Sequence, residues 1–203
     1  MIVAEAGVNH NGSPELALRL VDAAAEAGAD AVKFQTFKAD RLVTPTAPKA
    51  AYQIQATDKA ESQYEMLGRL ELSPETYSDL MAHCQKRNIL FMSSPFDEES
   101  ADFLEELGVA VFKVASGEIT NLPFLAHVSR KGRPIIISTG MADLGEVETA
   151  VNTMKNVGNE NIILLHCVSS YPADPADVNL LAMKTMRQAF DVPVGYSDHT
   201  LGI

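Results

Sequence analysis

The sequence predicts an α/β chain of the TIM-type (β/α)8 barrel class, and three observations support this prediction. Short apolar runs alternate along the chain with amphipathic segments of helical length, a pattern typical of a parallel sheet covered by helices. The runs are almost continuously apolar, as strands buried on both faces are. Polar residues follow nearly every run, as at the carboxyl-terminal face of a barrel, whereas an open doubly wound sheet would leave most of them unused.

Seven apolar runs are expected to form the strands. They comprise residues 2–6, 31–34, 90–92, 111–114, 135–137, 162–165 and 192–194. A barrel of this class has eight strands and about 250 residues. We therefore expect residues 1–203 to form one barrel domain that stops before the eighth strand.

The segments between the runs carry helix start and stop signals. Ser13 and Ser73 each precede a proline, which is typical of an N-cap followed by the first helical residue. Asp143 and Glu146 have the spacing of a capping box, and Gly108 follows the last apolar position of its helix. Further helices are expected after Asn121 and after Asn179.

Residues 39–72 interrupt this alternation between the second strand and its helix. An irregular stretch of that length in a compact domain is usually functional, often as a lid. We therefore expect it to be an irregular loop near the functional site.

Composition excludes several classes of partner. The formal net charge of −11 disfavours nucleic acid and anionic membrane surfaces, so an anionic ligand would need a few local cations. The longest apolar runs have the length of strands and are too short to span a bilayer. Two cysteines, and a start without a basic leader, predict a cytoplasmic protein with reduced thiols.

Two lysines lie within strand-like runs, where an unpaired ammonium would be costly. They are Lys33 and Lys113, and hydroxyl residues stand at the ends of neighbouring runs: Ser94, Ser116, Ser138 and Ser197. This combination fits a small polyanion carrying phosphate or carboxylate. The alternative is an internal salt bridge for each lysine.

Two carboxylates, Glu5 and Glu118, stand at or just after strand ends. Either could act as a general acid or base with a pKa tuned by a nearby lysine. The alternative is that each only neutralises a lysine.

The five histidines differ in their surroundings. His83 and His127 fall within helical patterns and are expected to be ordinary residues, and His10 lies in a tight turn that favours a structural hydrogen bond. His166 ends a strand and fits either the core or the site. His199, after the last run, is the best candidate for a metal ligand.

Seven segments together resemble the N-acetylneuraminate (sialic acid) synthase family. In family order they are AEAGVNHNGS, AVKFQTF, FMSSPFD, FKVASGEITN, PIIISTGMA, LLHCVSSYPA and VGYSDHTLGI. The resemblance implies a transferase that condenses phosphoenolpyruvate with N-acetylmannosamine or a related amino sugar. The products are a nonulosonic (sialic-type) acid and phosphate. It also implies a divalent metal, manganese or magnesium, and a homodimer in the full-length form.

The resemblance assigns roles residue by residue. It implies catalytic roles for Glu5, Glu118 and Lys113. It implies substrate binding by Lys33, Gln35, Ser94, Ser116, Ser138, Tyr171 and Ser197. His199 matches one metal ligand.

Two departures from the family pattern widen the choice. Ser169 stands where sialic acid synthases often carry a sugar-binding asparagine, so a legionaminic, pseudaminic or other nonulosonic acid synthase, or a spore-coat polysaccharide homologue, is an alternative. The strand-eight metal histidine and the antifreeze-like domain have no counterpart here, so we expect part of a longer synthase with little activity alone. The rivals are another phosphate-binding barrel enzyme, such as an aldolase or a heptulosonate-phosphate synthase, and an inactive ligand-binding barrel.

Overall fold

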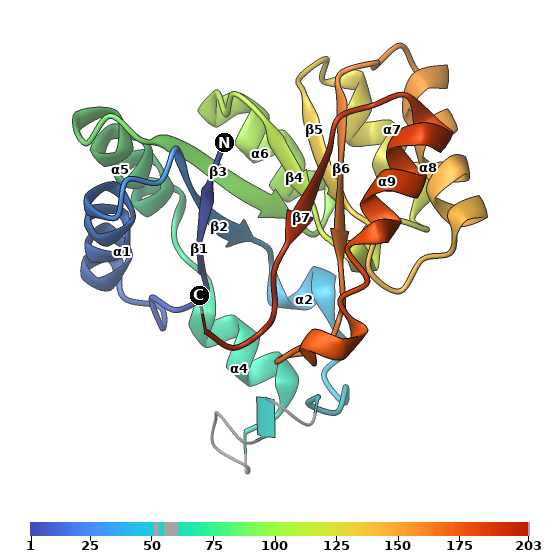
Figure 1. Cartoon of the computed structure of the whole chain (residues 1–203). Coiled ribbons are helices and arrows are strands. Elements are labelled where there is room, and N and C mark those ends of the chain that lie inside the picture. Colours follow the sequence, from blue (N-terminus) through green and yellow to red (C-terminus); the bar gives the residue numbers. More distant parts are fainter. Residues whose placement is uncertain (51–52, 55–60, 203) are drawn as a thin grey trace. The chain divides into compact units, whose positions relative to one another are not determined.

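The computed structural model describes residues 1–50, 53–54 and 61–202. Within these residues the chain divides into two compact units, Met1–Ala110 and Val111–Ile203. Figure 1 shows the elements of both, and each unit is described by itself.

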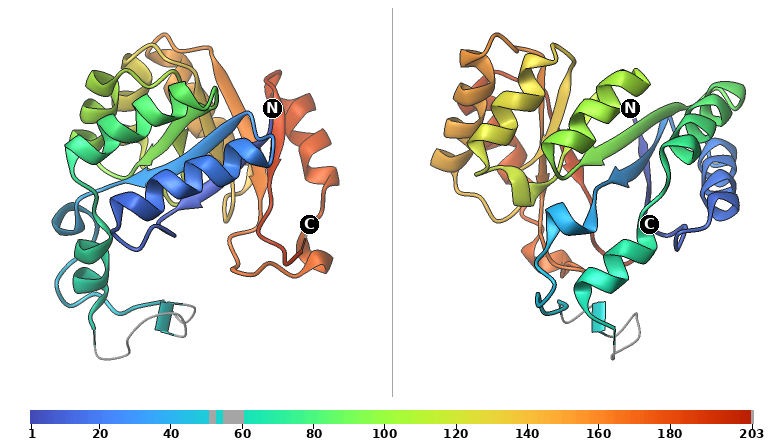
Figure 2. Two further views of the ribbon diagram at one scale, coloured as in Figure 1. Left: turned by 90° about the vertical axis from the view of Figure 1, so that its left-hand side faces the viewer. Right: turned by 180° about the vertical axis from the view of Figure 1, so that it is seen from behind.

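Unit 1 is built on three parallel strands in the order β1-β2-β3. They span β1 (Val3–Gly7), β2 (Ala31–Thr36) and β3 (Leu90–Pro95). Its longer helices are α1 (Pro14–Glu26), α5 (Pro74–Lys86) and α6 (Glu98–Leu107). Figure 2 shows α1 and α5 side by side, and both pack against the strands. This is the strand–helix alternation that the sequence predicts for this half of the chain.

Unit 2 continues with four parallel strands in the order β4-β5-β6-β7. They span β4 (Phe112–Val114), β5 (Ile135–Ser138), β6 (Ile162–Cys167) and β7 (Val194–Ser197). The helices are α7 (Leu122–Arg130), α8 (Leu144–Asn156) and α9 (Leu181–Phe190), with single turns η1 (Ser116–Glu118) and η2 (Pro175–Asp177). Consecutive helices pack on each other, α7 on α8 and α8 on α9. All seven predicted strands are confirmed, with bounds that differ by at most three residues at either end.

The predicted helix signals act as expected. The Ser13 and Ser73 hydroxyls accept backbone hydrogen bonds at the starts of α1 and α5. Asp143 and Glu146 form both hydrogen bonds of a capping box. Gly108 ends α6 in the left-handed region at φ +85°, where a side chain would be strained.

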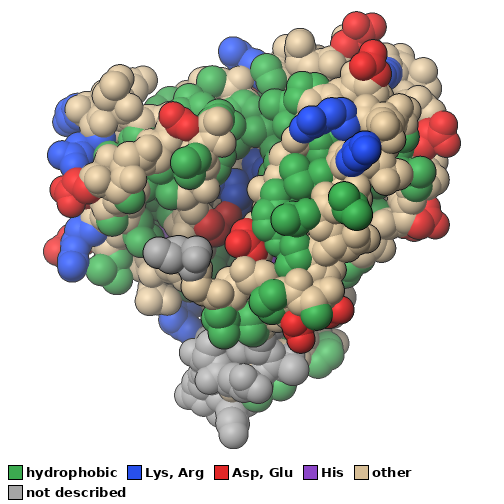
Figure 3. Space-filling view, viewed as in Figure 1, with side chains coloured by type: hydrophobic (Ala, Val, Ile, Leu, Met, Phe, Trp, Pro, Cys, Tyr) green, Lys and Arg blue, Asp and Glu red, His purple; other side chains and the backbone are tan. Residues whose placement is uncertain are grey.

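Each unit has its own apolar core. In unit 1, Phe34 stacks on Phe91 with ring centroids 5.9 Å apart. In unit 2, Phe112 and Ile137 are fully buried on adjacent strands. Figure 3 shows hydrophobic side chains gathered on the surface over β7 and α9, and Leu181 at the start of α9 is 75% exposed. Unit 2 therefore carries apolar surface near its last strand.

Residues 39–72 are more regular than the sequence suggests. They contain α2 (Ala39–Leu42) and α4 (Gln63–Leu70), and a capping box between Ser62 and Glu65 starts α4. Met66, Leu67 and Leu70 on α4 pack on Phe37 and its neighbours in a small core of their own. The expectation of an irregular loop is thus wrong for residues 39–42 and 63–70, which are helical, and is confirmed for residues 43–50. Its use as a lid stays a prediction, and residues 51–52 and 55–60 lie outside the described residues.

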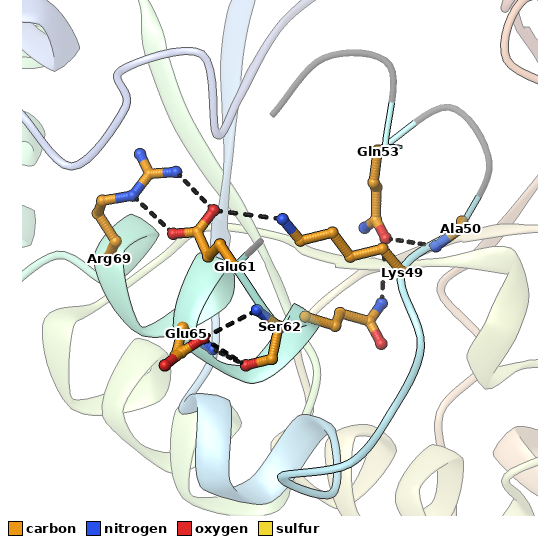
Figure 4. A network of polar contacts seen from close by, with 8 residues as sticks. Lys49, Ala50, Gln53, Glu61, Ser62, Glu65 and Arg69 are labelled. Atoms are coloured by element: carbon orange, nitrogen blue, oxygen red, sulfur yellow. Dashed lines mark hydrogen bonds and ion pairs between the residues drawn. The ribbon is translucent and has the colours of Figure 1, made fainter. Parts of the chain in front are cut away.

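A network of ion pairs links three charged residues within residues 39–72. Figure 4 shows Glu61 between Lys49 and Arg69. The Arg69 guanidinium donates to both Glu61 oxygens at 3.1 and 3.2 Å, and the Lys49 Nζ lies 3.3 Å from Glu61. Hydrogen bonds from Arg69 lower the pKa of Glu61, which keeps the carboxylate ionised. The network ties the chain before α4 to α4 itself.

No helix in the described part of the chain is long and apolar enough to cross a membrane.

Candidate active site

The first group of candidate residues lies on one face of the unit 1 strands. Glu5 stands opposite Lys33 in the β1–β2 register, and Gln35 stands opposite Ser94 in the β2–β3 register. Because side chains alternate between faces, Lys33 and Gln35 share a face with these partners. These four residues therefore stand on one face of the unit 1 strands, and their membership of one active site stays a prediction.

Glu5 and Lys33 form an ion pair. The Lys33 Nζ lies 2.5 Å from the Glu5 carboxylate, and the side chains are 13% and 52% exposed, respectively. Gly7 makes room for this pair, since a Cβ at Gly7 would lie 2.9 Å from Glu5 Oε1. The contact matches the alternative in which Glu5 neutralises the lysine. Because the Glu5 carboxylate is half exposed, a bound anion could replace it.

A buried network supports the second pair of this group. The Tyr77 hydroxyl donates to the backbone oxygen of Gln35 at 2.7 Å, and Thr36 shares a 2.7 Å hydrogen bond with Ser93. Burial raises the pKa of Tyr77 to about 12, so its phenol stays protonated as a donor. The network fixes the backbone that carries Gln35 and Ser94.

The second group lies in unit 2 and centres on Lys113. This lysine is 7% exposed, and its Nζ donates to Ser138 Oγ at 2.7 Å and to the Val114 oxygen at 2.8 Å. An ammonium only donates, so Ser138 is the acceptor and keeps its own proton for another partner. A buried cation beside a hydroxyl donor is an arrangement that favours binding an anion.

Ser116 lies at the start of the turn after β4, next to the residues that follow β5 and β6. Its Oγ accepts the backbone N–H of Gly140 at 3.0 Å and lies 3.1 Å from the Cys167 thiol. A Cβ at Gly140 would come within 2.9 Å of both Ser116 Oγ and Cys167 Sγ. Glycine at 140 is therefore what allows the backbone N–H to approach the Ser116 hydroxyl.

Glu118 ends the same turn and has a different kind of partner. Its Oε2 accepts a hydrogen bond from the Asn121 side-chain amide at 2.8 Å, and the residue is partly exposed. The contacts recorded for the described residues give it no lysine partner. The interpretation that Glu118 only neutralises a lysine is thus not supported.

The third group brings together His199, Tyr171 and Ser197. His199 donates its Nδ1 proton to the Val168 oxygen at 2.6 Å, which leaves Nε2 without a proton on the neutral ring. Nε2 lies 3.5 Å from Ser197 Oγ, and the Tyr171 ring is 4.4 Å from the imidazole, centroid to centroid. The described residues hold no cluster of three His, Cys, Asp or Glu side chains suited to a metal ion.

The hydrogen bond from His199 Nδ1 to the Val168 oxygen is the feature of the site that fits a divalent metal. Metal-bound histidines characteristically donate their other ring proton to a carbonyl or carboxylate, which fixes the tautomer and turns the free nitrogen toward the metal. His199 has that arrangement with the Val168 oxygen. It fits one ligand position of a metal site.

The other histidines have structural partners. His10 is buried, its Nδ1 accepts the Gly12 N–H at 3.0 Å, and burial lowers its pKa, which confirms the structural role expected for it. His83 pairs with Asp22 at 2.8 Å on the helical surface of unit 1. His166 donates to the Val178 oxygen at 2.6 Å. Its neighbour Cys167 lies on the opposite face of β6, so His166 faces away from Ser138.

Sequence reasoning missed two participants in unit 2, Gly140 and Cys167, which contact Ser116. Near them, the Ser169 Oγ is buried without a hydrogen-bond partner among the described residues. The alternation of side chains along β6 could have indicated them. Leu165 pairs with Ser138, so Cys167 and Ser169, two and four residues later, are expected on the same face as Ser138.

Comparison with known proteins gives a consistent result along the whole chain. A model of the NeuB family matches residues 20–203. The chain is 56% identical to N,N'-diacetyllegionaminic acid synthase from Legionella pneumophila, covering all of this chain and 58% of that protein. It is 51% identical to the Campylobacter jejuni protein of the same name, covering all of this chain and 61% of that protein. The chain thus spans about three fifths of the length of these curated relatives.

One solved structure tests the fold directly. The crystal structure of N-acetylneuraminic acid synthetase from Leptospira borgpetersenii, in complex with citrate, superposes with a TM-score of 0.86 and 38% identity. The match covers all of this chain and 66% of that one. With seven parallel strands in the described residues, the likeness confirms the predicted fold class, a partial TIM-type barrel.

Proposed function

Because the chain belongs to the NeuB family, we propose that it condenses phosphoenolpyruvate with an N-acetylated amino sugar to give a nonulosonic acid and phosphate. The observation that carries the proposal is the buried Lys113, whose ammonium donates to the Ser138 hydroxyl at 2.7 Å. A buried ammonium beside a hydroxyl that keeps its own proton suits an anionic group, and phosphoenolpyruvate carries two such groups.

Unit 2 supplies the donors for one end of phosphoenolpyruvate. Lys113 contributes a charge-assisted hydrogen bond, Ser138 contributes its unused proton, and Ser116 contributes a second hydroxyl. We propose that Ser197, opposite Cys167 in the β6–β7 register, adds a fourth donor. These donors hold the substrate in one orientation, which is where most of the rate acceleration from positioning arises.

We propose that Lys33, Ser94, Gln35 and Glu5 of unit 1 also take part in the reaction. We propose that Lys33 exchanges Glu5 for an anionic group of the substrate, because their ion pair is half open to solvent. Glu5 is then released as a carboxylate that can hold a proton or stabilise positive charge. Gln35 and Tyr171 are proposed to bind the sugar.

The reaction forms one carbon–carbon bond and breaks one carbon–oxygen bond. The π electrons of the enol form a bond from C3 of phosphoenolpyruvate to the aldehyde carbon of the open-chain sugar. C2 becomes electron-deficient, water adds to it, and the adduct expels phosphate with the former bridging oxygen. The proton lost by the water balances the proton gained by the aldehyde oxygen. Glu118 and Glu5 are proposed to stabilise C2 and to transfer these protons.

A divalent metal, manganese or magnesium, is proposed as the cofactor, with His199 as one ligand through Nε2. When bound, such an ion supplies Lewis-acid polarisation of the aldehyde. The protein's own contribution is the hydrogen bond from His199 Nδ1 to the Val168 oxygen, which orients the imidazole before the ion arrives.

The acceptor is proposed to carry two acetamido groups. The two synthases reported above are named for a diacetylated product, and phosphoenolpyruvate brings no nitrogen, so both acetamido groups would come from the acceptor. Ser169 supports this choice, because a serine replaces the asparagine often found at that position in sialic acid synthases. N-acetylmannosamine is the alternative acceptor.

A product analysis distinguishes these acceptors. The protein as its gene encodes it in full would be incubated with phosphoenolpyruvate, manganese and each acceptor in turn, and the products identified by mass spectrometry. We expect a product with the mass of the acceptor plus pyruvate, formed faster from the diacetylated sugar. Faster reaction of N-acetylmannosamine would overturn the acceptor proposal, and no condensation product from either sugar would overturn the proposed reaction.

A further inference from the structure

Ser116 Oγ makes two hydrogen bonds, and the direction of one of them can reverse. The Gly140 N–H can only donate, so Ser116 Oγ accepts it at 3.0 Å. The contact with Cys167 at 3.1 Å can run in either direction, because both a hydroxyl and a thiol can donate or accept. Two arrangements are therefore available, and they differ in where the Ser116 proton points.

In one arrangement Ser116 donates to the Cys167 sulfur, and its proton is not available to a ligand. In the other the thiol donates to Ser116 Oγ, and the Ser116 proton is free to bind an anion. An oxygen that accepts two hydrogen bonds is also polarised into a better donor. The choice between the two arrangements thus decides whether Ser116 can contribute to anion binding.

We propose that Cys167 is a positioning residue that turns the Ser116 hydroxyl toward phosphoenolpyruvate by donating its thiol proton to Ser116 Oγ. The inference rests on the proposed function, since it needs an anion at Ser116. Cys167 is 5% exposed and lies at the end of β6 on the face shared with Ser138, with its Sγ 3.1 Å from Ser116 Oγ.

The close packing around Gly140 makes the contact between Ser116 and Cys167 sensitive to any side chain added at position 140. A Cβ there would lie 2.9 Å from Cys167 Sγ and from Ser116 Oγ, and closer still to the Ser169 Oγ, which is buried and has no hydrogen-bond partner in the part of the chain that the structure describes. Contacts under 3.0 Å force one of the groups to move. Position 140 therefore requires glycine if Ser116 is to keep the hydrogen bond from the backbone N–H of this residue.

A double-mutant cycle read by calorimetry with phosphoenolpyruvate tests the proposal. Cys167→Ala should weaken binding by about 2- to 10-fold, the range of one modest hydrogen bond. Cys167→Ser, which keeps a donor, should bind more tightly than Cys167→Ala. In a Ser116→Ala background, Cys167→Ala should have no further effect, because its partner is absent.

A matched glycine pair and a spectroscopic signal complete the experiment. Gly140→Ala should weaken binding about as much as Ser116→Ala, whereas Gly145→Ala, which meets nothing closer than 3.4 Å, should bind as the unaltered protein does. In a Cys84→Ala background, the infrared S–H band of Cys167 should move to lower frequency when phosphoenolpyruvate is added, because the thiol becomes a donor.

The outcomes separate this inference from the proposed function. If the unaltered protein binds no phosphoenolpyruvate, both are wrong. If it binds and Cys167→Ala binds equally well, only the role of Cys167 is wrong. Equal weakening by Cys167→Ala with and without Ser116 would indicate a purely structural effect, and an S–H band that ignores the ligand would likewise overturn the inference.

Discussion

Replacing Lys113 by methionine removes the buried charge while keeping most of the side-chain volume. In the unaltered protein the Lys113 Nζ donates to Ser138 at 2.7 Å and to the Val114 oxygen at 2.8 Å. If the site holds an anionic group of phosphoenolpyruvate, Lys113→Met removes a charge-assisted hydrogen bond of about 1.5–3 kcal/mol. At about 1.4 kcal/mol per tenfold, the dissociation constant should rise about 10- to 150-fold.

The same substitution should change stability little. Removing a buried ammonium also removes its desolvation penalty, which favours the folded state. Leaving a buried acceptor unsatisfied costs about 1–3 kcal/mol, which offsets that gain. One kcal/mol shifts the melting temperature by about 2–4 °C at this chain length, so we expect a midpoint within about 4 °C of the unaltered protein.

Titration calorimetry with phosphoenolpyruvate measures the predicted loss, and Lys155→Met is the matched control. Lys155 is an exposed lysine in the last turn of α8, so its substitution makes the same change in net charge away from the site. We expect Lys155→Met to bind within twofold of the unaltered protein. Equal affinity of Lys113→Met and Lys155→Met, with both proteins folded, would refute the assignment of Lys113 to the anion site.

Three further outcomes are expected. His199→Ala should weaken manganese binding by more than the 10- to 100-fold cost of losing an outer partner, and unchanged affinity by calorimetry would exclude His199 as a ligand. Phe112→Ala should lower the free energy of unfolding by about 3–5 kcal/mol, because Phe112 is fully buried; a loss under about 1 kcal/mol in urea would contradict the packing. Burial lowers the pKa of His10, so the unfolded chain takes up the proton first and stability should fall as pH drops below about 6.5; His10→Gln should flatten this slope.

Elements with strong local signals could be predicted from the sequence. The strands are continuous apolar runs, and their carboxyl ends were recognisable from polar residues such as Lys33 and Ser138. Ser13 and Ser73 marked helix starts because an N-cap is a contact within one turn. The ends of these elements are set by contacts between residues that are close in the sequence, so the sequence alone is enough to locate them approximately.

Features that depend on contacts across the fold could not be predicted in the same way. The helix α4 was missed because its apolar side chains, such as Met66 and Leu70, are stabilised by Phe37, which lies far away in the sequence. Cys167 reaches Ser116 only because β4, β5 and β6 are aligned in register. His199 was identified as a ligand candidate, but its tautomer depends on the Val168 oxygen, 31 residues earlier in the chain.

The position of the cleaved bond tests the proposed reaction most directly. Phosphoenolpyruvate carrying ¹⁸O in its bridging oxygen would be incubated with manganese, the diacetylated acceptor and the protein as its gene encodes it in full. Mass spectrometry of the released phosphate then reports which bond broke. Attack by C3 followed by addition of water at C2 predicts that the phosphate retains the label and that the nonulosonic acid has lost it. Unlabelled phosphate, with the ¹⁸O left on the carbon product, would show phosphorus–oxygen cleavage and would contradict the account.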